Sequence, residues 1–133
     1  MGTSSAKPKK LRGAAGLLFA QYRHRCKKRN IYFDLTFDEF VTLTSSPCAY
    51  CGSAPTQKST QHSNTYLYSG IDRKDNQGGY YLENCVPACG TCNSIKGGNL
   101  SYLEMLAAMG AVKKVRGPAF KPKGRPRRII RSI

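Results

Sequence analysis

The pattern of apolar and polar positions predicts a helix near the start of the chain. Apolar or small residues recur at helical spacing between positions 11 and 29, and cationic side chains lie on the opposite face. The apolar stripe consists of Leu11, Ala14, Ala15, Leu18, Tyr22 and Cys26. We therefore expect a helix over about residues 11–29, with Cys26 in the core.

Two capping boxes predict two further helices. Thr36 and Glu39 have the Thr-x-x-Glu spacing ahead of a short apolar face, which predicts a two-turn helix that ends at "SSPC". Ser101 and Glu104 repeat this spacing ahead of "YLEMLAAMGAVKKV". The face expected to be covered in this last helix consists of Leu103, Leu106, Ala107, and Met109 or Gly110.

The middle of the chain has the pattern of short strands. "IYFDLT" at 31–36 is β-branched and aromatic, which favours an extended segment. "TYLYSGID" at 65–72 predicts a strand, "NQGG" at 76–79 a turn, and "YYL" at 80–82 the returning strand. Residues 57–65 are polar, and no element is predicted for most of them. Together these patterns predict the α+β class.

The length of 133 residues fits one small domain with tails. We expect a basic leader at 1–10, a domain at 11–116 and a basic tail at 117–133. The N-terminus lacks the apolar stretch of a signal peptide, and no apolar run reaches the length of a membrane span. The sequence therefore predicts an intracellular protein that is not secreted and has no membrane partner.

The net charge of +15 is concentrated at the two ends of the chain. Residues 1–30 and 113–133 each contain nine Lys or Arg and no Asp or Glu. Residues 31–112 contain four Lys or Arg and seven Asp or Glu, a net charge of −3. Basic arms around a mildly acidic centre indicate contact with nucleic acid. The alternative is that the basic ends serve only solubility.

The cysteine spacing predicts a structural metal site. The chain has six cysteines at positions 26, 48, 51, 85, 89 and 92. Two Cys-x-x-Cys pairs, Cys48 with Cys51 and Cys89 with Cys92, have the spacing of a tetrahedral four-cysteine zinc site. A pair of disulfides or a redox motif is the alternative. Cys85 lies four residues before Cys89, which is a poorer spacing for a ligand.

Three stretches of the sequence resemble the HNH, or His-Me finger, endonuclease superfamily in its phage and mobile-element form. They are "PCAYCG", "GIDRKDNQGGYYLEN" and "CVPACGTCNSIKG", and the resemblance covers about residues 12–106. It implies a zinc-stabilised ββα-metal finger with flanking helices and basic tails. It also implies hydrolysis of phosphodiester bonds in double-stranded DNA with one divalent metal, Mg²⁺ or Mn²⁺.

The resemblance assigns roles to several polar residues. Asp72 and Asn93 fall on positions that bind the divalent metal, and Asn84 falls on the central Asn that holds the finger loop. Carboxylate and carboxamide oxygens suit such a hard ion. Asp75 and Asn76 have good turn chemistry ahead of glycines, and Asp75 is also a candidate to support the metal site.

Arg73 departs from the family pattern, because it lies where the family has its general-base histidine. A guanidinium remains protonated and cannot accept a proton. Arg73 could instead bind the phosphate, or His62 could supply the base. In the third interpretation cleavage is lost, and the chain is a catalytically inactive zinc-finger protein that binds nucleic acid.

Overall fold

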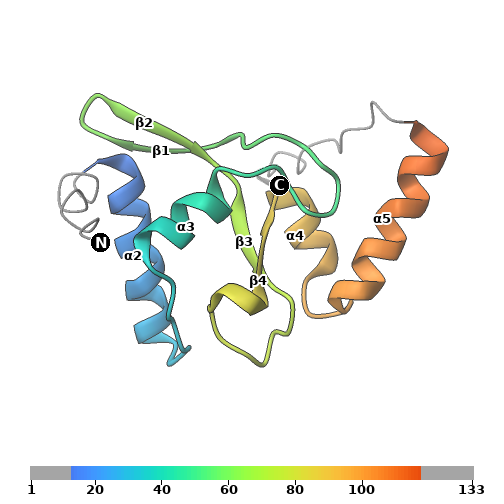
Figure 1. Ribbon diagram of the computed structural model, residues 1–133, viewed down its shortest axis with the longest axis horizontal. Coiled ribbons are helices and arrows are strands. Elements are labelled where there is room, and N and C mark those ends of the chain that lie inside the picture. Colours follow the sequence, from blue (N-terminus) through green and yellow to red (C-terminus); the bar gives the residue numbers. More distant parts are fainter. Residues whose placement is uncertain (1–12, 118–133) are drawn as a thin grey trace, which may run out of the picture.

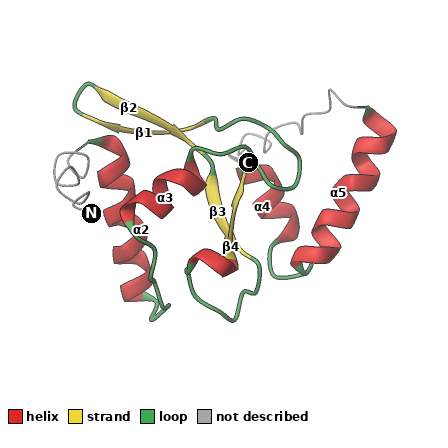
Figure 2. Ribbon diagram, viewed as in Figure 1, coloured by secondary structure: helices red, strands yellow, loops and turns green. Residues whose placement is uncertain are grey.

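The computed structural model describes residues 13–117, and its elements form an α+β arrangement (Figures 1 and 2). The elements in chain order are α2 (Ala14–Lys28), α3 (Phe37–Thr44), β1 (Gln57–Gln61), β2 (Asn64–Tyr68), β3 (Gly70–Arg73), the 3₁₀ turn η2 (Leu82–Asn84), β4 (Cys85–Ala88), α4 (Gly90–Lys96) and α5 (Tyr102–Arg116). The α+β class is confirmed. The leader expected at 1–10, and the tail beyond Gly117, lie outside the described residues.

Two antiparallel hairpins form the sheet structure of the described residues. In the β1–β2 hairpin Gln57 pairs with Tyr68, and the hairpin lies over the N-terminal end of α2 (Figure 1). There the Ser59 hydroxyl donates a hydrogen bond of 3.2 Å to the Ala14 carbonyl. In the central β3–β4 hairpin, Asp72 pairs with Val86 and Arg73 pairs with Cys85.

The β3–β4 hairpin separates two apolar clusters. Figure 1 shows α2 and α3 on one side of this hairpin, with α4 and α5 on the other. The first cluster consists of Leu18, Phe19, Leu35, Phe37, Phe40, Leu43, Ile71 and Cys85. The second cluster consists of Cys48, Tyr50, Cys51, Val86, Ala88, Cys92, Met105 and Met109. Successive strand residues face opposite sides, so Ile71 faces the first cluster and Val86 the second.

The helix predictions are largely confirmed. Both capping boxes are present, with Thr36 capping α3 and Ser101 capping α5. The predicted covered face of α5 is wrong in part, because Leu103 is 72% exposed while Met105 and Met109 are buried. The two methionines are four residues apart and pack against the cysteine-rich cluster.

The strand predictions are wrong in three places. The single strand predicted at 65–72 is two strands, β2 and β3, which belong to different hairpins. Residues 57–61 form β1 despite their polar composition, with Ser59 as the buried position. The strand that returns to β3 is β4 at Cys85–Ala88, and not residues 80–82. Tyr80 forms only an isolated parallel bridge with Phe33. Pro87 lies inside β4 and gives its sequence a poor strand signal.

Among residues 13–117, no helix combines the length and the apolar character that a membrane crossing requires.

Candidate functional site

Four cysteines converge into one cluster on the α4 side of β3–β4. The Sγ atoms of Cys48, Cys51, Cys89 and Cys92 all lie within 4.8 Å of one another. A tetrahedral zinc with bonds of about 2.3 Å separates its sulfur ligands by about 3.8 Å. Cys51 Sγ and Cys89 Sγ are 3.7 Å apart. The cluster therefore fits the predicted zinc site in residue type and in spacing.

The first Cys-x-x-Cys turn is shaped by backbone hydrogen bonds. The Gly52 N–H donates to the Cys48 carbonyl at 2.9 Å, and Gly52 has a φ of +80°, which glycine adopts without strain. The Ala49 N–H donates to the Pro87 carbonyl at 2.8 Å, which joins the turn to β4. A hydrogen bond from Cys92, helped by nearby backbone N–H groups, lowers the pKa of the Cys48 thiol to about 4. Burial raises the pKa of the Cys51 thiol in the same turn, so the turn favours the thiolate at Cys48 and not at Cys51.

The second Cys-x-x-Cys turn opens α4. Cys89 is the N-cap residue, and its Sγ accepts a hydrogen bond of 3.3 Å from the Cys92 N–H. Cys26 and Cys85 lie outside the cluster and are both buried. Burial raises the pKa of the Cys85 thiol to about 12, and this thiol packs in the first apolar cluster, on the other side of the hairpin from the cysteine cluster. The prediction that Cys26 is a core residue agrees with its 4% exposure.

Asp72 is buried on the face of β3 that points toward the cysteine cluster. Its Oδ2 accepts a hydrogen bond of 2.5 Å from the Tyr50 hydroxyl. Its Oδ1 lies 3.4 Å from the Lys96 ammonium. Burial and the Asp72 carboxylate raise the pKa of Tyr50 well above its usual range, so its hydroxyl donates and does not act as a base. Tyr50 belongs to the first cysteine turn and Lys96 to the last turn of α4.

Arg73 faces the opposite side of the hairpin from Asp72, because the two residues are adjacent in a strand. Its Nη1 donates to the Gly78 carbonyl at 2.9 Å. Its guanidinium carbon lies 5.1 Å from the centre of the Tyr80 ring. Tyr80 in turn contacts Tyr22 of α2. Arg73 therefore belongs to the α2 side of the molecule.

Asn84 holds the loop that joins β3 to β4. Its Oδ1 accepts from the Asp75 N–H at 3.0 Å, and its Nδ2 donates to the carbonyls of Asp75 and Gly79 at 3.1 and 2.9 Å. The Lys74 N–H also donates to the Asn84 carbonyl at 2.7 Å. Asn84 is only 5% exposed. These contacts fix the loop between Arg73 and Tyr80.

The other predicted polar residues lie around this loop and at the start of α4. Asp75 is exposed, and its Oδ1 accepts a hydrogen bond of 2.9 Å from the Gln77 N–H, as in an Asx turn. Asn76 Nδ2 instead donates to the Gly97 carbonyl at 3.2 Å and joins the loop to the end of α4. Asn93 is half-buried on α4, one helical turn before Lys96. The α4 side chain that contacts Asp72 is Lys96.

His62 lies in the turn of the β1–β2 hairpin and has a φ of +56°. This turn lies at the end of β2 remote from β3, and five strand residues span roughly 17 Å. In Figure 1 the hairpin end points away from β3 and β4. The structure therefore does not bring His62 to Asp72.

A divalent cation on Asp72 does not fit the arrangement of the described residues. Both carboxylate oxygens already have partners, and one partner is a cation. A hard ion such as Mg²⁺ needs at least one free carboxylate oxygen, with water and phosphate oxygens as its other ligands. Within residues 13–117 the four cysteines form the one group of three or more Cys, His, Asp or Glu side chains close enough to share an ion.

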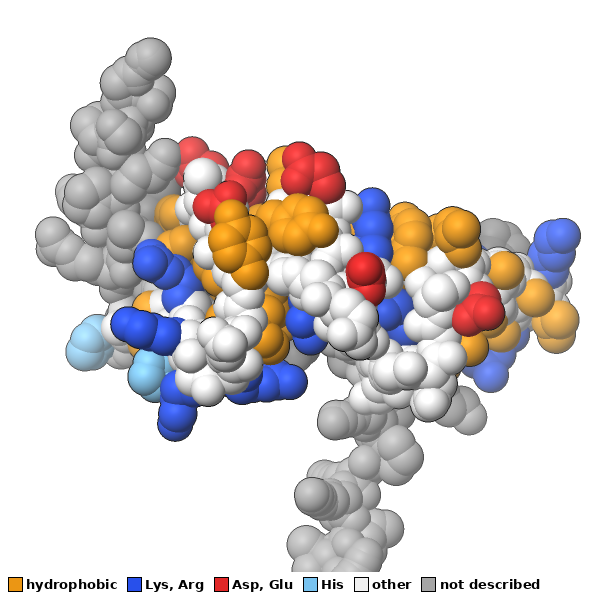
Figure 3. Space-filling model, turned by 90° about the horizontal axis from the view of Figure 1, so that it is seen from below, with side chains coloured by type: hydrophobic (Ala, Val, Ile, Leu, Met, Phe, Trp, Pro, Cys, Tyr) orange, Lys and Arg blue, Asp and Glu red, His pale blue; other side chains and the backbone are white. Residues whose placement is uncertain are grey.

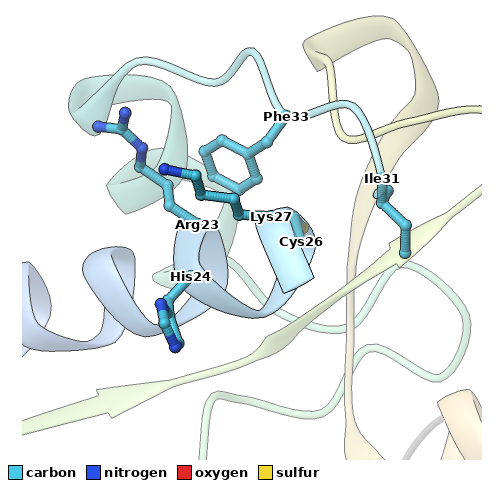
Figure 4. Close-up of a pocket in the computed structure, with 6 residues that line it drawn as sticks. All are labelled: Arg23, His24, Cys26, Lys27, Ile31 and Phe33. Carbon is cyan, nitrogen blue, oxygen red and sulfur yellow. The ribbon is translucent and has the colours of Figure 1, made fainter. Parts of the chain in front are cut away.

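The C-terminal half of α2 presents an exposed cationic surface. Figure 3 shows a group of Lys, Arg and His side chains at the left-hand end of the molecule, where α2 lies, with several acidic side chains along the opposite edge of that end and further Lys or Arg side chains in the middle and at the right-hand end. A shallow hollow of about 440 Å³ adjoins this surface. Figure 4 shows that the side chains of Arg23 and Lys27 extend from α2 toward the side on which the Phe33 ring lies. The residues that line the hollow are Arg23, His24, Cys26, Lys27, Ile31 and Phe33.

The cationic surface of α2 continues to Arg73. The Arg25 guanidinium carbon lies 4.8 Å from the centre of the Tyr22 ring, and the Tyr22 and Tyr80 rings are 6.0 Å apart. The charges of Arg73, Arg25 and Arg29 all act to lower the pKa of Cys26, although burial has the larger effect and raises it. We call Arg25, Arg29 and Arg73 the arginine group.

Comparisons with known proteins agree with the resemblance seen in the sequence. The chain has the fold of the rare-cutting HNH restriction endonuclease PacI, with a TM-score of 0.59, 23% identity, and coverage of 76% of this chain and 78% of that one. It is 32% identical over 72 residues to the SPbeta prophage-derived putative HNH endonuclease YoqL of Bacillus subtilis (strain 168). It is 35% identical over 78 residues to the uncharacterized protein R423 of Acanthamoeba polyphaga mimivirus.

The similarity to these curated relatives is partial. The match covers 53% of this chain and 31% of YoqL, and 59% of this chain and 13% of R423. No family model matches the chain. The structural likeness to PacI over 76% of this chain confirms the predicted HNH-type fold.

Sequence reasoning missed Tyr50 and Lys96 as partners of Asp72. Lys96 follows Cys92 by four residues, so it lies on the same face of α4 as a cysteine ligand. It is also the one basic residue between positions 75 and 112. These two signals could have directed attention to Lys96, whereas Tyr50 carried no signal beyond its place between two cysteines.

Proposed function

We propose that this chain is an HNH-type endonuclease that hydrolyses phosphodiester bonds in double-stranded DNA. The observation that carries the proposal is the β3–β4–α4 unit, in which the four-cysteine cluster supports one side and Asn84 holds the loop. The fold shared with an HNH restriction endonuclease and the similarity to a putative HNH endonuclease support it. Asp72, Arg73, Asn84 and Asn93 are the proposed site residues.

The phosphate backbone of DNA would bind at the arginine group. Arg73 stays charged and is held in position by Gly78 and Tyr80, while Arg25 and Arg29 are exposed at the C-terminal end of α2, on the same side of the hairpin. Guanidinium groups suit phosphate because they present several donors in a plane. The function of Arg73 in this proposal is to bind and neutralise phosphate, in place of the general base of the family pattern.

The proposed metals have different support. The cysteine cluster would hold zinc and fix α4 against β4, which positions Asp72 and Asn93 without taking part in bond cleavage. Family resemblance also implies Mg²⁺ or Mn²⁺ on Asp72 and Asn93. Because Asp72 is paired with Tyr50 and Lys96, we assign no reaction step to such an ion.

The second candidate is a zinc-stabilised DNA-binding protein without cleavage. It is favoured by one observation, which is the presence of Arg73 where the family pattern has a base. Both candidates predict salt-dependent DNA binding through the arginine group.

Incubation of the zinc-loaded chain with supercoiled plasmid tests the proposal. With Mg²⁺ or Mn²⁺ in low-salt buffer, we expect nicked or linear plasmid to accumulate with time. Plasmid that is bound in a gel-shift experiment but stays supercoiled with both ions would contradict the endonuclease and favour the binding protein. Arg25→Gln/Arg29→Gln should weaken binding and lower its salt dependence, and Lys58→Gln on the β1–β2 hairpin is the exposed control.

A further inference from the structure

Asp72 lies in a charge arrangement that the family pattern does not require. Lys96 is fully buried and Asp72 is 5% exposed, so the ammonium and the carboxylate are removed from water together. Buried charges are retained when they are paired and hydrogen-bonded. Lys96 Nζ lies 3.4 Å from Asp72 Oδ1 and donates to the Arg73 carbonyl at 3.2 Å. The pair is therefore a built part of the domain.

The position of the pair depends on both cysteine turns. Tyr50, which contacts Asp72 Oδ2, lies between Cys48 and Cys51. Lys96 lies one helical turn after Cys92 on the same side of α4. Closing the cysteine cluster therefore brings a hydroxyl to one oxygen of Asp72 and a cation to the other.

We infer that Lys96 is the resident cation of the Asp72 site and excludes a divalent ion from it in the free protein. Asp72 offers one negative charge, and a divalent ion on it would lie against the positive charge of Lys96 without screening by water. Lys96 and the ion are therefore alternative occupants. The inference rests on the proposed function, because it concerns the same site. Its test measures Mn²⁺ binding and not DNA cleavage, so the inference and the proposed function can fail separately.

The test measures Mn²⁺ binding to the zinc-loaded full chain by the electron paramagnetic resonance of free Mn²⁺. We expect Asp72→Asn to leave Mn²⁺ binding of the wild-type chain unchanged. Lys96→Ala should bind Mn²⁺ at least about tenfold more tightly than wild type, because the competing cation has been removed. The double variant Lys96→Ala/Asp72→Asn should lose this gain. Lys96→Gln, which keeps a donor but not the charge, serves if Lys96→Ala does not fold.

Two results would overturn the inference. One is Mn²⁺ binding by the wild-type chain that Asp72→Asn abolishes. The other is a folded Lys96 variant that gains no Mn²⁺ binding.

A further measurement needs no variant. Reductive methylation followed by peptide mass spectrometry, carried out without Mn²⁺, should find Lys96 protected relative to the exposed Lys58. Labelling of Lys96 to the same extent as Lys58 would contradict the inference, because a resident cation of a buried site is not accessible.

Discussion

At the scale of single residues, Asp72 and Arg73 serve different sides of one hairpin. The strand alternation turns Asp72 toward Tyr50 and Lys96, and Arg73 toward Tyr80 and α2. A proposed phosphate contact and a buried ion pair are therefore adjacent in sequence but separated by the sheet. Asn84 holds the loop that follows this strand, so it fixes the end of the strand that carries both residues.

Asn84→Ala should destabilise the domain by about 2–4 kcal/mol, because it leaves buried partners on the loop backbone without hydrogen bonds. Urea unfolding followed by circular dichroism measures this change. Asn76→Ala removes a single exposed hydrogen bond to Gly97 and should cost less than about 1 kcal/mol. Equal losses for the two variants would contradict the assignment of Asn84 as the residue that holds the loop.

Ionisation of the Tyr22 hydroxyl should lower the free energy of unfolding at alkaline pH. Burial raises its pKa from 10.0 to about 12, so the unfolded chain loses this proton first as pH rises. The contribution is fully present below pH 10 and is lost between pH 10 and 12, by up to about 2.7 kcal/mol. Tyr22→Phe should show a flatter decline over this range in urea titrations. At neutral pH it should lose about 1 kcal/mol, because the Ile71 N–H loses its acceptor.

At the scale of elements, the sequence predicted what local chemistry determines. The two capping boxes and the Cys-x-x-Cys turns depend on residues three or four apart, and they appear as predicted. The strand pairing does not depend on neighbours alone. Residues 85–88 pair with β3 because the loop before them is held by Asn84, and β1 forms because Ser59 packs on α2. Such long-range contacts leave no periodic pattern in a short polar segment.

The candidate site likewise contains features that the local sequence predicts and features that depend on long-range contacts. The cysteine cluster could be predicted from spacing, and the position of Asn84 from a motif. The Asp72–Lys96 pair could not, because it depends on α4 packing beside β3, and its two residues are 24 positions apart in the sequence. The basic composition of the two ends is visible in the sequence. Only the fold shows that Arg25 and Arg73 each lie over one ring of the Tyr22–Tyr80 pair.

Gly79 marks a close approach between the loop and the segment before α3. A Cβ at Gly79 would lie 2.5 Å from the Tyr32 carbonyl oxygen, where the Tyr80 N–H also bonds. Gly79→Ala should therefore cost about 1–3 kcal/mol in unfolding free energy. Gly110→Ala, on α5 with open space around it, should instead stabilise by up to about 1 kcal/mol. A neutral Gly79→Ala in the same urea titration would contradict this contact.

At the scale of the whole molecule, the cysteine cluster is part of the core. Three of its cysteines lie in the second apolar cluster, whose remaining apolar members are few. If zinc is the resident ion, its binding energy is folding energy, and a small domain depends on it. The same cluster carries Tyr50 and α4, so the order of the proposed site depends on metal.

Removal of zinc should unfold the half of the molecule that contains α4 and α5. A chelator added to the zinc-loaded chain should release about one zinc and reduce the helical circular dichroism signal. Cys85→Ala, outside the cluster, should keep the zinc, and Cys92→Ser should lose it. Release of zinc without any change in circular dichroism would show that the cluster does not support the fold.

The central claim is that the β3–β4–α4 unit cleaves DNA, and the rate of plasmid nicking by matched carboxylate variants tests it most directly. Wild type and Asp34→Asn, which changes an exposed acid whose side chain bonds Tyr32 and not a proposed site residue, should nick supercoiled plasmid at equal rates. Asp72→Asn leaves the buried Lys96 ammonium without its carboxylate, and Lys96 also holds the Arg73 carbonyl, so this variant should be slower by on the order of 100-fold while it remains folded and zinc-loaded. Equal rates for Asp72→Asn and wild type, or no nicking by the wild-type chain, would contradict the account.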